Sequence, residues 1–205
     1  MTIRHREYHM SDSIYAPPEA DVSAPAGDEP RYYIVAPFKF ILLSVLTFTL
    51  YFVYWFYSNW KRIKIDDNDD IWPVPRSFFY IFFTHSLFTD VQESFKTQGR
   101  EWSWSPGVLA TAFVVLTLVS NFLDRLIDYD AYSLWLGLWP LASAIILTFL
   151  LLPAQKAINA VCNDIGGTSN SKLTVANWVW MVIGGLLWLL VLIGVLAMIA
   201  DPTLQ

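Results

Sequence analysis

The chain is poor in charge and in cysteine for its length. Charged residues make up 15% of its 205 residues, and the single cysteine, Cys162, cannot form an internal disulfide. The cations form no basic patch, which argues against a nucleic-acid partner. The start of the chain lacks the basic stretch and short apolar core of a secretory signal, so we expect the first hydrophobic segment to be retained.

Recognised catalytic motifs are missing as well. The sequence contains no Gly-x-Ser-x-Gly, no Gly-x-x-x-x-Gly-Lys, no His-Glu-x-x-His and no Cys-x-x-Cys. Cys162 falls in an expected amphipathic helix that offers no evident histidine base. The sequence therefore predicts a protein that is not an enzyme, with no catalytic residue and no cofactor.

Two groups of potential metal ligands fail on spacing. The acidic run 66–70 begins like a calcium loop, but an isoleucine stands where the turning glycine belongs and a serine where the bidentate glutamate belongs. His85 precedes Asp90 and Glu93 at distances that place the three side chains on different faces of a helix. No metal site is predicted.

Apolar residues dominate what is present. The hydrophobic fraction is 55%, the mean hydropathy is +0.42 and there are ten Trp, which exceeds the usual content of a soluble domain. The runs 37–60, 107–127, 134–153 and 175–200 each approach the roughly 20 residues that cross a bilayer. We therefore predict an all-α integral membrane protein with four transmembrane helices.

Two further segments complete the expected architecture. Residues 1–31 are acidic and contain several prolines, which predicts a disordered tail and leaves 32–205 as one transmembrane domain. The apolar run 77–91 is short for a span, and its continuation has helical periodicity. It predicts an interfacial helix at about 76–97. A shallow re-entrant helix is the competing interpretation, and a full crossing is a third.

The distribution of cations predicts the orientation. Residues 61–106 and 154–174 hold eight Lys and Arg, whereas the other side holds five, three of them in the tail. Because cytoplasmic loops are enriched in Lys and Arg, both segments are expected in the cytoplasm and both termini in the periplasm. An acidic tail that fails to translocate is the alternative.

Three segments carry a resemblance: YFVYWFYSNWKRIK, PRSFFYIFFTHSLF and LTVANWVWMVIGGLLWLLVLIG. Together they resemble a family of uncharacterised bacterial inner-membrane proteins. Its members show a Tyr-Trp-Phe-Tyr-x-Asn-Trp-Lys block closing the first span, then an Arg-x-Phe-Phe helix, then a final span with Gly-Gly. Here these features fall at 54–61, at 76–79 and at Gly184 with Gly185. The resemblance covers about 32–194. It implies a bacterial inner-membrane location and no mechanism.

The aromatic block and its neighbouring cations form the candidate site. Indole and phenol rings pair an apolar body with a polar edge, and cations beside them attract anionic phosphates. An ordinary interfacial anchor is the alternative role. The candidate partner- or lipid-binding residues are Tyr54, Trp55, Tyr57, Asn59, Trp60, Lys61, Arg62 and Arg76.

Two functions from different classes follow. The first is a non-catalytic membrane protein that binds membrane lipids, or a protein partner or second copy, through this layer. The second is a small oligomeric transporter or channel. A transport path requires strongly polar groups at mid-membrane depth, where the sequence offers only Asn121 and the kinking Pro140.

Overall fold

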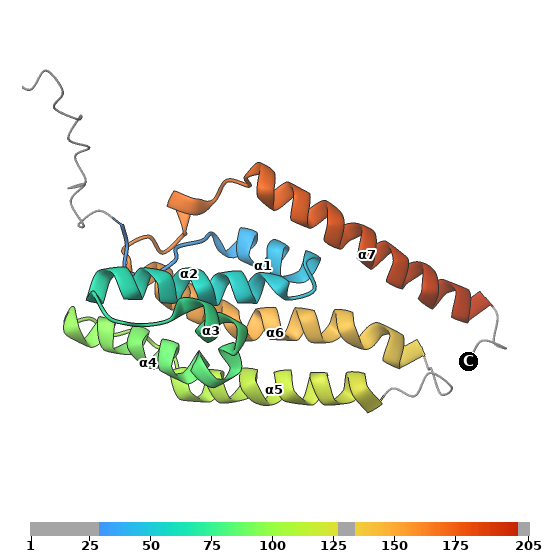
Figure 1. The fold of residues 1–205 in the computed structure, drawn as a ribbon, viewed down its shortest axis with the longest axis horizontal. Coiled ribbons are helices and arrows are strands. Elements are labelled where there is room, and N and C mark those ends of the chain that lie inside the picture. Colours follow the sequence, from blue (N-terminus) through green and yellow to red (C-terminus); the bar gives the residue numbers. More distant parts are fainter. Residues whose placement is uncertain (1–28, 127–133, 201–205) are drawn as a thin grey trace, which may run out of the picture.

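The computed structural model describes residues 29–126 and 134–200. Within these residues the chain is helical and contains no strand, which confirms the predicted all-α class. The predicted disordered tail, 1–31, falls almost entirely outside the described residues. The helices lie roughly side by side along one axis (Figure 1). Their bounds are α1 Pro37–Leu46, α2 Leu50–Asp67, α3 Pro73–Phe78, α4 Tyr80–Thr97, α5 Pro106–Leu126, α6 Leu134–Val161 and α7 Val175–Ala200, with a 3₁₀ turn η2 at Thr168–Asn170.

Three helices are long and apolar enough to cross a membrane. The qualifying segments are Pro106–Leu123 in α5, Leu138–Val161 in α6 and Val175–Ala197 in α7. They correspond to three of the four predicted spans, and α6 continues through Pro153 to Val161. Helices α5 and α7 run in one direction and α6 in the other (Figure 1).

The predicted first span, 37–60, is wrong. The helix stops after Leu46, Phe48 and Thr49 adopt left-handed backbone angles, and α2 runs back beside α1 (Figure 1). The Phe40 ring packs against Tyr51, Phe52 and Trp55 of α2, with centroids 5.9, 6.4 and 5.9 Å apart. With a rise of about 1.5 Å per residue, α1 is only about 15 Å long, half the bilayer core. The apolar run is therefore a helical hairpin.

Local hydrogen bonds hold this reversal. The Thr47 hydroxyl donates to the carbonyl of Leu43 (2.7 Å) and accepts from the N–H of Tyr51 (3.1 Å). The Thr47 hydroxyl thus takes the place of the Thr47 carbonyl, to which the Tyr51 N–H would bond in a continuous helix. Hydropathy measures how apolar a segment is and gives no information on whether the chain reverses its direction. The prediction of a first span failed for this reason.

The predicted interfacial helix, 76–97, is divided between α3 and α4. Helix α4 does not lie across the end of the bundle, because it runs antiparallel to α5. His85 Nε2 lies 3.0 Å from Thr111 Oγ1, and the rings of Phe88 and Trp104 are 5.5 Å apart. Its contacts with α5 therefore align it with the long helices.

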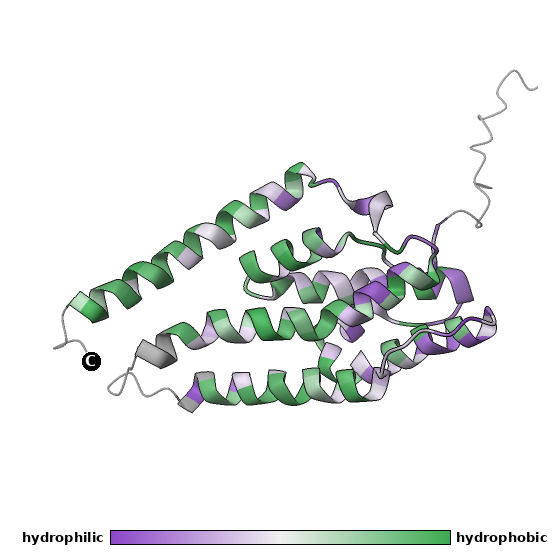
Figure 2. Ribbon diagram, turned by 180° about the vertical axis from the view of Figure 1, so that it is seen from behind, coloured by the Kyte–Doolittle hydropathy of each residue, from purple (hydrophilic) through white to green (hydrophobic). Residues whose placement is uncertain are grey.

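Hydrophilic residues gather at one end of the molecule (Figure 2). This polar end contains residues 29–36, the C-terminal parts of α2 and α4, and the loop 162–174. Of the 13 Lys and Arg, two lie outside the described residues. Among the eleven that remain, Arg125 at the end of α5 is the one at the far end. The other ten belong to the polar half of the bundle.

The residues before α1 are not separated from 61–106, as the predicted first span would have required. Arg31 forms ion pairs with Asp66 (2.7 Å), Asp67 and Asp90 (3.1 Å), so residues before α1 lie at the same end as 61–106. A hairpin enters and leaves at one end, whereas a span would have separated them. Helix α7 ends at the far end, so residues 29 and 200 lie at opposite ends of the bundle (Figure 1).

Candidate functional site

The structure distributes the eight predicted site residues between the interior and the surface. Trp55, Asn59 and Trp60 are buried, while Tyr54 and Lys61 are exposed. The remaining three, Tyr57, Arg62 and Arg76, are intermediate. The aromatic block therefore does not form one surface, since successive helical residues point to different sides of α2.

Two of the buried members, Asn59 and Trp55, help to hold an extended N-terminal segment, residues 31–36, in place. Tyr33 N–H donates to Asn59 Oδ1 (3.1 Å), and Asn59 Nδ2 donates to the carbonyl of Trp55 (2.9 Å). The Trp55 indole N–H donates to Gln155 of α6. Because these side chains are buried and hydrogen-bonded inside the protein, they are not available for direct contact with a lipid or partner.

Amides on α6 complete the hydrogen bonds of this segment, which lies outside any helix or sheet. Gln155 Nε2 donates to the Tyr33 carbonyl (3.2 Å). Asn159 accepts from Val35 N–H (3.3 Å) and donates to Val35 O (2.9 Å). A buried backbone group without a hydrogen-bond partner lowers the stability of the folded state, so these amides allow the segment to be buried. Sequence reasoning missed both, although two amides four residues apart in an apolar stretch were a visible signal.

Trp60 and Arg76 pair with each other. The Arg76 guanidinium lies 4.5 Å from the Trp60 ring centroid and 5.1 Å from that of Phe83 in α4. This cation–π packing joins α2, α3 and α4. Arg76 therefore belongs to a helix contact and does not line the cleft described next.

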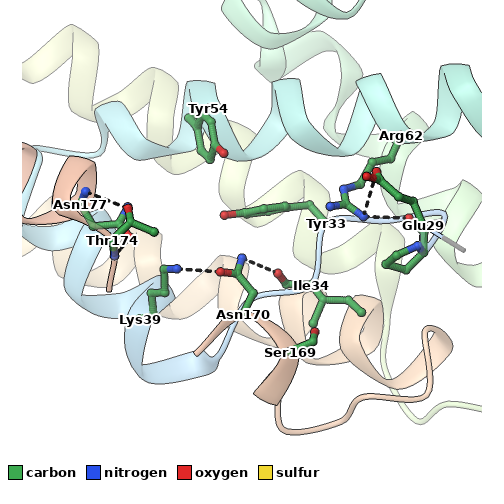
Figure 3. Close-up of a pocket in the computed structure, with 11 residues that line it drawn as sticks. Glu29, Tyr33, Ile34, Lys39, Tyr54, Arg62, Ser169, Asn170, Thr174 and Asn177 are labelled. Carbon is green, nitrogen blue, oxygen red and sulfur yellow. Dashed lines mark hydrogen bonds and ion pairs between the residues drawn. The ribbon is translucent and has the colours of Figure 1, made fainter. Parts of the chain in front are cut away.

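A cleft of about 500 Å³ opens between α2, the N-terminal segment and the start of α7 (Figure 3). It contains two of the predicted residues, Tyr54 and Arg62, and others that sequence reasoning did not select. Its principal lining residues are Glu29, Tyr33, Lys39, Tyr54, Arg62, Asn170 and Asn177. We call it the cationic cleft.

Lys39 supplies the deepest charge of the cationic cleft. Its side chain comes from the first turn of α1, and the residue is 3% exposed. Its ammonium donates to Asn170 Oδ1 (2.7 Å) and to the carbonyl of Lys172 (2.8 Å). Among the described residues no carboxylate lies within ion-pair distance of it. Burial lowers the pKa of Lys39, which an anion in the cleft would oppose.

Arg62 supplies the second charge from α2. It donates to the Pro30 carbonyl (3.1 Å) and lies 5.8 Å from the Tyr33 ring centroid. Glu29 approaches it at 4.0 Å, but that side chain is 80% exposed. An ion pair this exposed and this long contributes little, so Arg62 keeps much of its charge for a ligand.

The start of α7 adds a third favourable element. Thr174 and Asn177 cap each other's N–H groups, with bonds of 3.0 and 3.3 Å. Both residues line the cleft, so the positive end of the helix dipole lies at its wall. The arrangement can bind an anion such as a phosphate. It contains no pair of groups set for acid–base or nucleophilic chemistry.

Several of the residues considered as metal ligands have other partners. Within the described residues, no three His, Cys, Asp or Glu side chains gather as a metal site would require. Asp90 accepts from Tyr32 Oη (2.7 Å) and from Arg31, and His85 contacts Thr111. The acidic run 66–70 likewise contributes Asp66 and Asp67 to Arg31.

Comparison with known proteins adds no relative. No protein-family model, no curated protein and no solved structure matches this chain. The geometry of the site is therefore the basis for the proposal that follows.

Proposed function

We propose that the protein is a non-catalytic integral membrane protein that binds the anionic headgroup of a membrane lipid in the cationic cleft. The observation that carries the proposal is Lys39, a buried cation bonded only to neutral oxygens, with Arg62 lining the same cleft. Buried charges in proteins are normally paired. A phosphate bound in the cleft would supply Lys39 with the missing partner.

The position of the cleft favours a lipid over a soluble anion. It lies beside the first turns of α1 and α7, at the end of the bundle that holds ten of the eleven described Lys and Arg. Such an excess marks the cytoplasmic side, where anionic lipids attract basic groups. We infer that the polar end faces the cytoplasm, in the bacterial inner membrane that the family resemblance implies. Helix α4 then returns beside α5 as a re-entrant element.

Charge removal in the cleft tests the proposal. In Lys39→Gln and Arg62→Gln, we expect the protein to lose about tenfold or more in affinity for dioleoyl phosphatidylglycerol, since charge-assisted hydrogen bonds contribute about 1.5–3 kcal/mol each. Binding is measured by native mass spectrometry from a gentle detergent. The matched control is Lys61→Gln, which removes an exposed charge from the same helix outside the cleft. An equal loss in all three variants would contradict a specific site.

Removal of the exposed carboxylate of Glu29 at the cleft is expected to have the opposite effect on lipid binding. Glu29 competes with a ligand for Arg62, so Glu29→Gln should strengthen phosphatidylglycerol binding while leaving the fold unchanged.

Binding should also weaken as the pH rises through the lowered pKa of Lys39, because the neutral amine no longer attracts an anion. Lys39→Gln should remove that pH dependence.

The hairpin supports the second candidate, a small transporter or channel. Transporters use interrupted helices whose non-helical backbone lies within the protein. The turn at Phe48 and Thr49 is such an interruption. Purified protein in liposomes would raise ion or solute flux above that of empty vesicles under this alternative, and would leave it unchanged under the lipid-binding function.

A further inference from the structure

We propose a second lipid site, which holds a single acyl chain in the apolar cavity beyond the tip of the α1–α2 hairpin, between α6 and α7. It is separate from the cationic cleft and does not depend on it. The ligand is the hydrocarbon chain of a bilayer lipid, recognised by shape and apolarity and not by its headgroup.

The cavity exists because the hairpin is shorter than the helices beside it. Helix α1 ends at Leu46, whereas α7 continues to Ala200 (Figure 1). The tip is fixed to α7, since the Trp188 indole N–H donates to the Val45 carbonyl (2.9 Å) and its ring stacks on Phe48 at 3.9 Å. The hairpin packs against both α6 and α7 and leaves an open cavity of about 320 Å³ beyond its end.

The lining of the cavity selects hydrocarbon. Its walls are Val45 and Leu46 at the tip, Leu141 of α6, and Gly185, Trp188 and Leu192 of α7. The one polar hydrogen among these side chains, on the Trp188 indole, is already donated to Val45. A water molecule needs two to four polar partners, which these walls do not offer, so an apolar occupant is favoured.

Depth and access point to a membrane lipid. Along α7 the cavity extends from Gly185 to Leu192, about 15–26 Å from the start of a helix about 39 Å long, so it lies near the middle of the span. At that depth the surroundings are acyl chains. Leu192 is 44% exposed, which leaves the cavity open on the membrane-facing side of α7.

The cavity is too small for a helix of a second copy to enter it, so a second copy could only cover it from outside. A helix is about 10 Å across with its side chains, and 320 Å³ would accommodate only about 4 Å of such a cylinder. That is less than one helical turn of about 5.4 Å. A flexible chain of single methylene groups can enter a space that a helix cannot.

Filling the cavity tests the inference. A Cβ built on Gly185 meets nothing within 4 Å, so Gly185→Leu projects a side chain into the cavity without disturbing the backbone. The control is Gly194→Leu on the same helix, where a Cβ also meets nothing and which is not part of the lining. Delipidated protein is titrated with dioleoyl phosphatidylcholine, whose headgroup carries no net charge, and bound lipid is counted by native mass spectrometry.

We expect wild type, Gly194→Leu and Lys39→Gln to bind one phosphatidylcholine that Gly185→Leu does not bind, with at least a tenfold loss of affinity. The lipid should also raise the thermal stability of the first three proteins and leave that of Gly185→Leu unchanged. Equal lipid counts and equal thermal shifts in Gly185→Leu and wild type would overturn the proposal. So would a Gly185→Leu variant that loses a dimer while keeping its lipid, because the cavity would then belong to a protein interface. Neither result bears on phosphatidylglycerol binding by Lys39 and Arg62, so the two sites fail separately.

Discussion

The N-terminal segment and helix α7 are attached to the bundle in different ways. Residues 31–36 lie between α2 and α6, and their backbone is bonded by Asn59, Gln155 and Asn159. Helix α7 contacts the hairpin mainly through a close backbone approach at Gly184 and the docking of Trp188. Most of its large apolar side chains are exposed. The N-terminal segment depends on buried hydrogen bonds, whereas the attachment of helix α7 depends on the small size of Gly184.

This difference predicts which substitutions are costly. A lost amide leaves buried polar groups without partners, and neither water nor backbone movement can restore them. A bulkier residue on α7 can be relieved by a small shift of a helix that faces lipid. The N-terminal segment should therefore be the more sensitive region.

The largest effect is expected at Asn159. Asn159→Leu keeps the size of the side chain but leaves the N–H and C=O of Val35 and one Gln155 donor without their partner, which should lower the free energy of unfolding by about 3 kcal/mol. The control Asn121→Leu changes an exposed amide on α5 and should have little effect. Denaturant unfolding in a fixed detergent measures both. Equal stabilities would show that the amide network does not hold the segment.

A glycine pair gives the second effect. Gly167 has φ +64°, and a Cβ there would lie 2.5 Å from the Val35 backbone, so Gly167→Ala should cost about 2 kcal/mol through strain and displacement of the N-terminal segment. At Gly166 the nearest atom is a Thr168 methyl at 3.2 Å, which can move. Gly166→Ala should therefore be nearly neutral. Thermal unfolding of the two variants compares them directly, and an equal loss would contradict the close approach.

The α1–α7 contact gives a third, smaller effect. A Cβ on Gly184 would collide with the Leu46 carbonyl, whereas Gly185 has open space. Gly184→Ala should lower stability by about 1 kcal/mol and speed amide hydrogen exchange in α1 and α7, because α7 must move outward. Gly185→Ala is the control and should match wild type. Unchanged exchange in Gly184→Ala would show that α7 is not docked through this residue.

The smallest effect concerns the turn before α7. Backbone N–H groups of Ser169 and Thr168 donate to Asp164 and lower its pKa from 3.8 to about 2. The folded state therefore binds this proton less readily than the unfolded state, so the carboxylate stabilises the fold above about pH 4 and loses that contribution as the pH falls toward 2. Asp164→Ala should unfold more easily near pH 6 and converge with wild type near pH 2. A constant difference between the two across this range would contradict the prediction.

Long apolar runs were enough to predict α5, α6 and α7, because crossing a bilayer imposes a length and a composition that the sequence displays. The run 37–60 met the same criteria and failed, since Thr47 can close a turn in apolar surroundings and hydropathy carries no information on direction. That one error reversed the placement of Arg31 relative to Asp66 and Asp67. The error lay in the assumed span and not in the count of Lys and Arg along the chain.

The candidate site was predicted in part. Arg62 and Tyr54 line the cationic cleft, whereas Trp55, Asn59 and Trp60 were chosen for an aromatic composition that equally suits an interior. Lys39 was not among the selected residues, and only the packing of Asn170 and Lys172 around it revealed a buried cation. Gly184 and Gly185 are indistinguishable in sequence, yet one touches backbone and the other faces a cavity.

The sequence by itself determined the helical class, the three long apolar helices and the excess of cations on one side, because each is a property of composition along the chain. Only the tertiary structure decided that the first apolar segment turns back, which aromatic residues are buried, and that Lys39 and Arg62 line one cleft. These depend on contacts between residues far apart in the chain, whose energies are set by geometry and by the partners that each polar group finds.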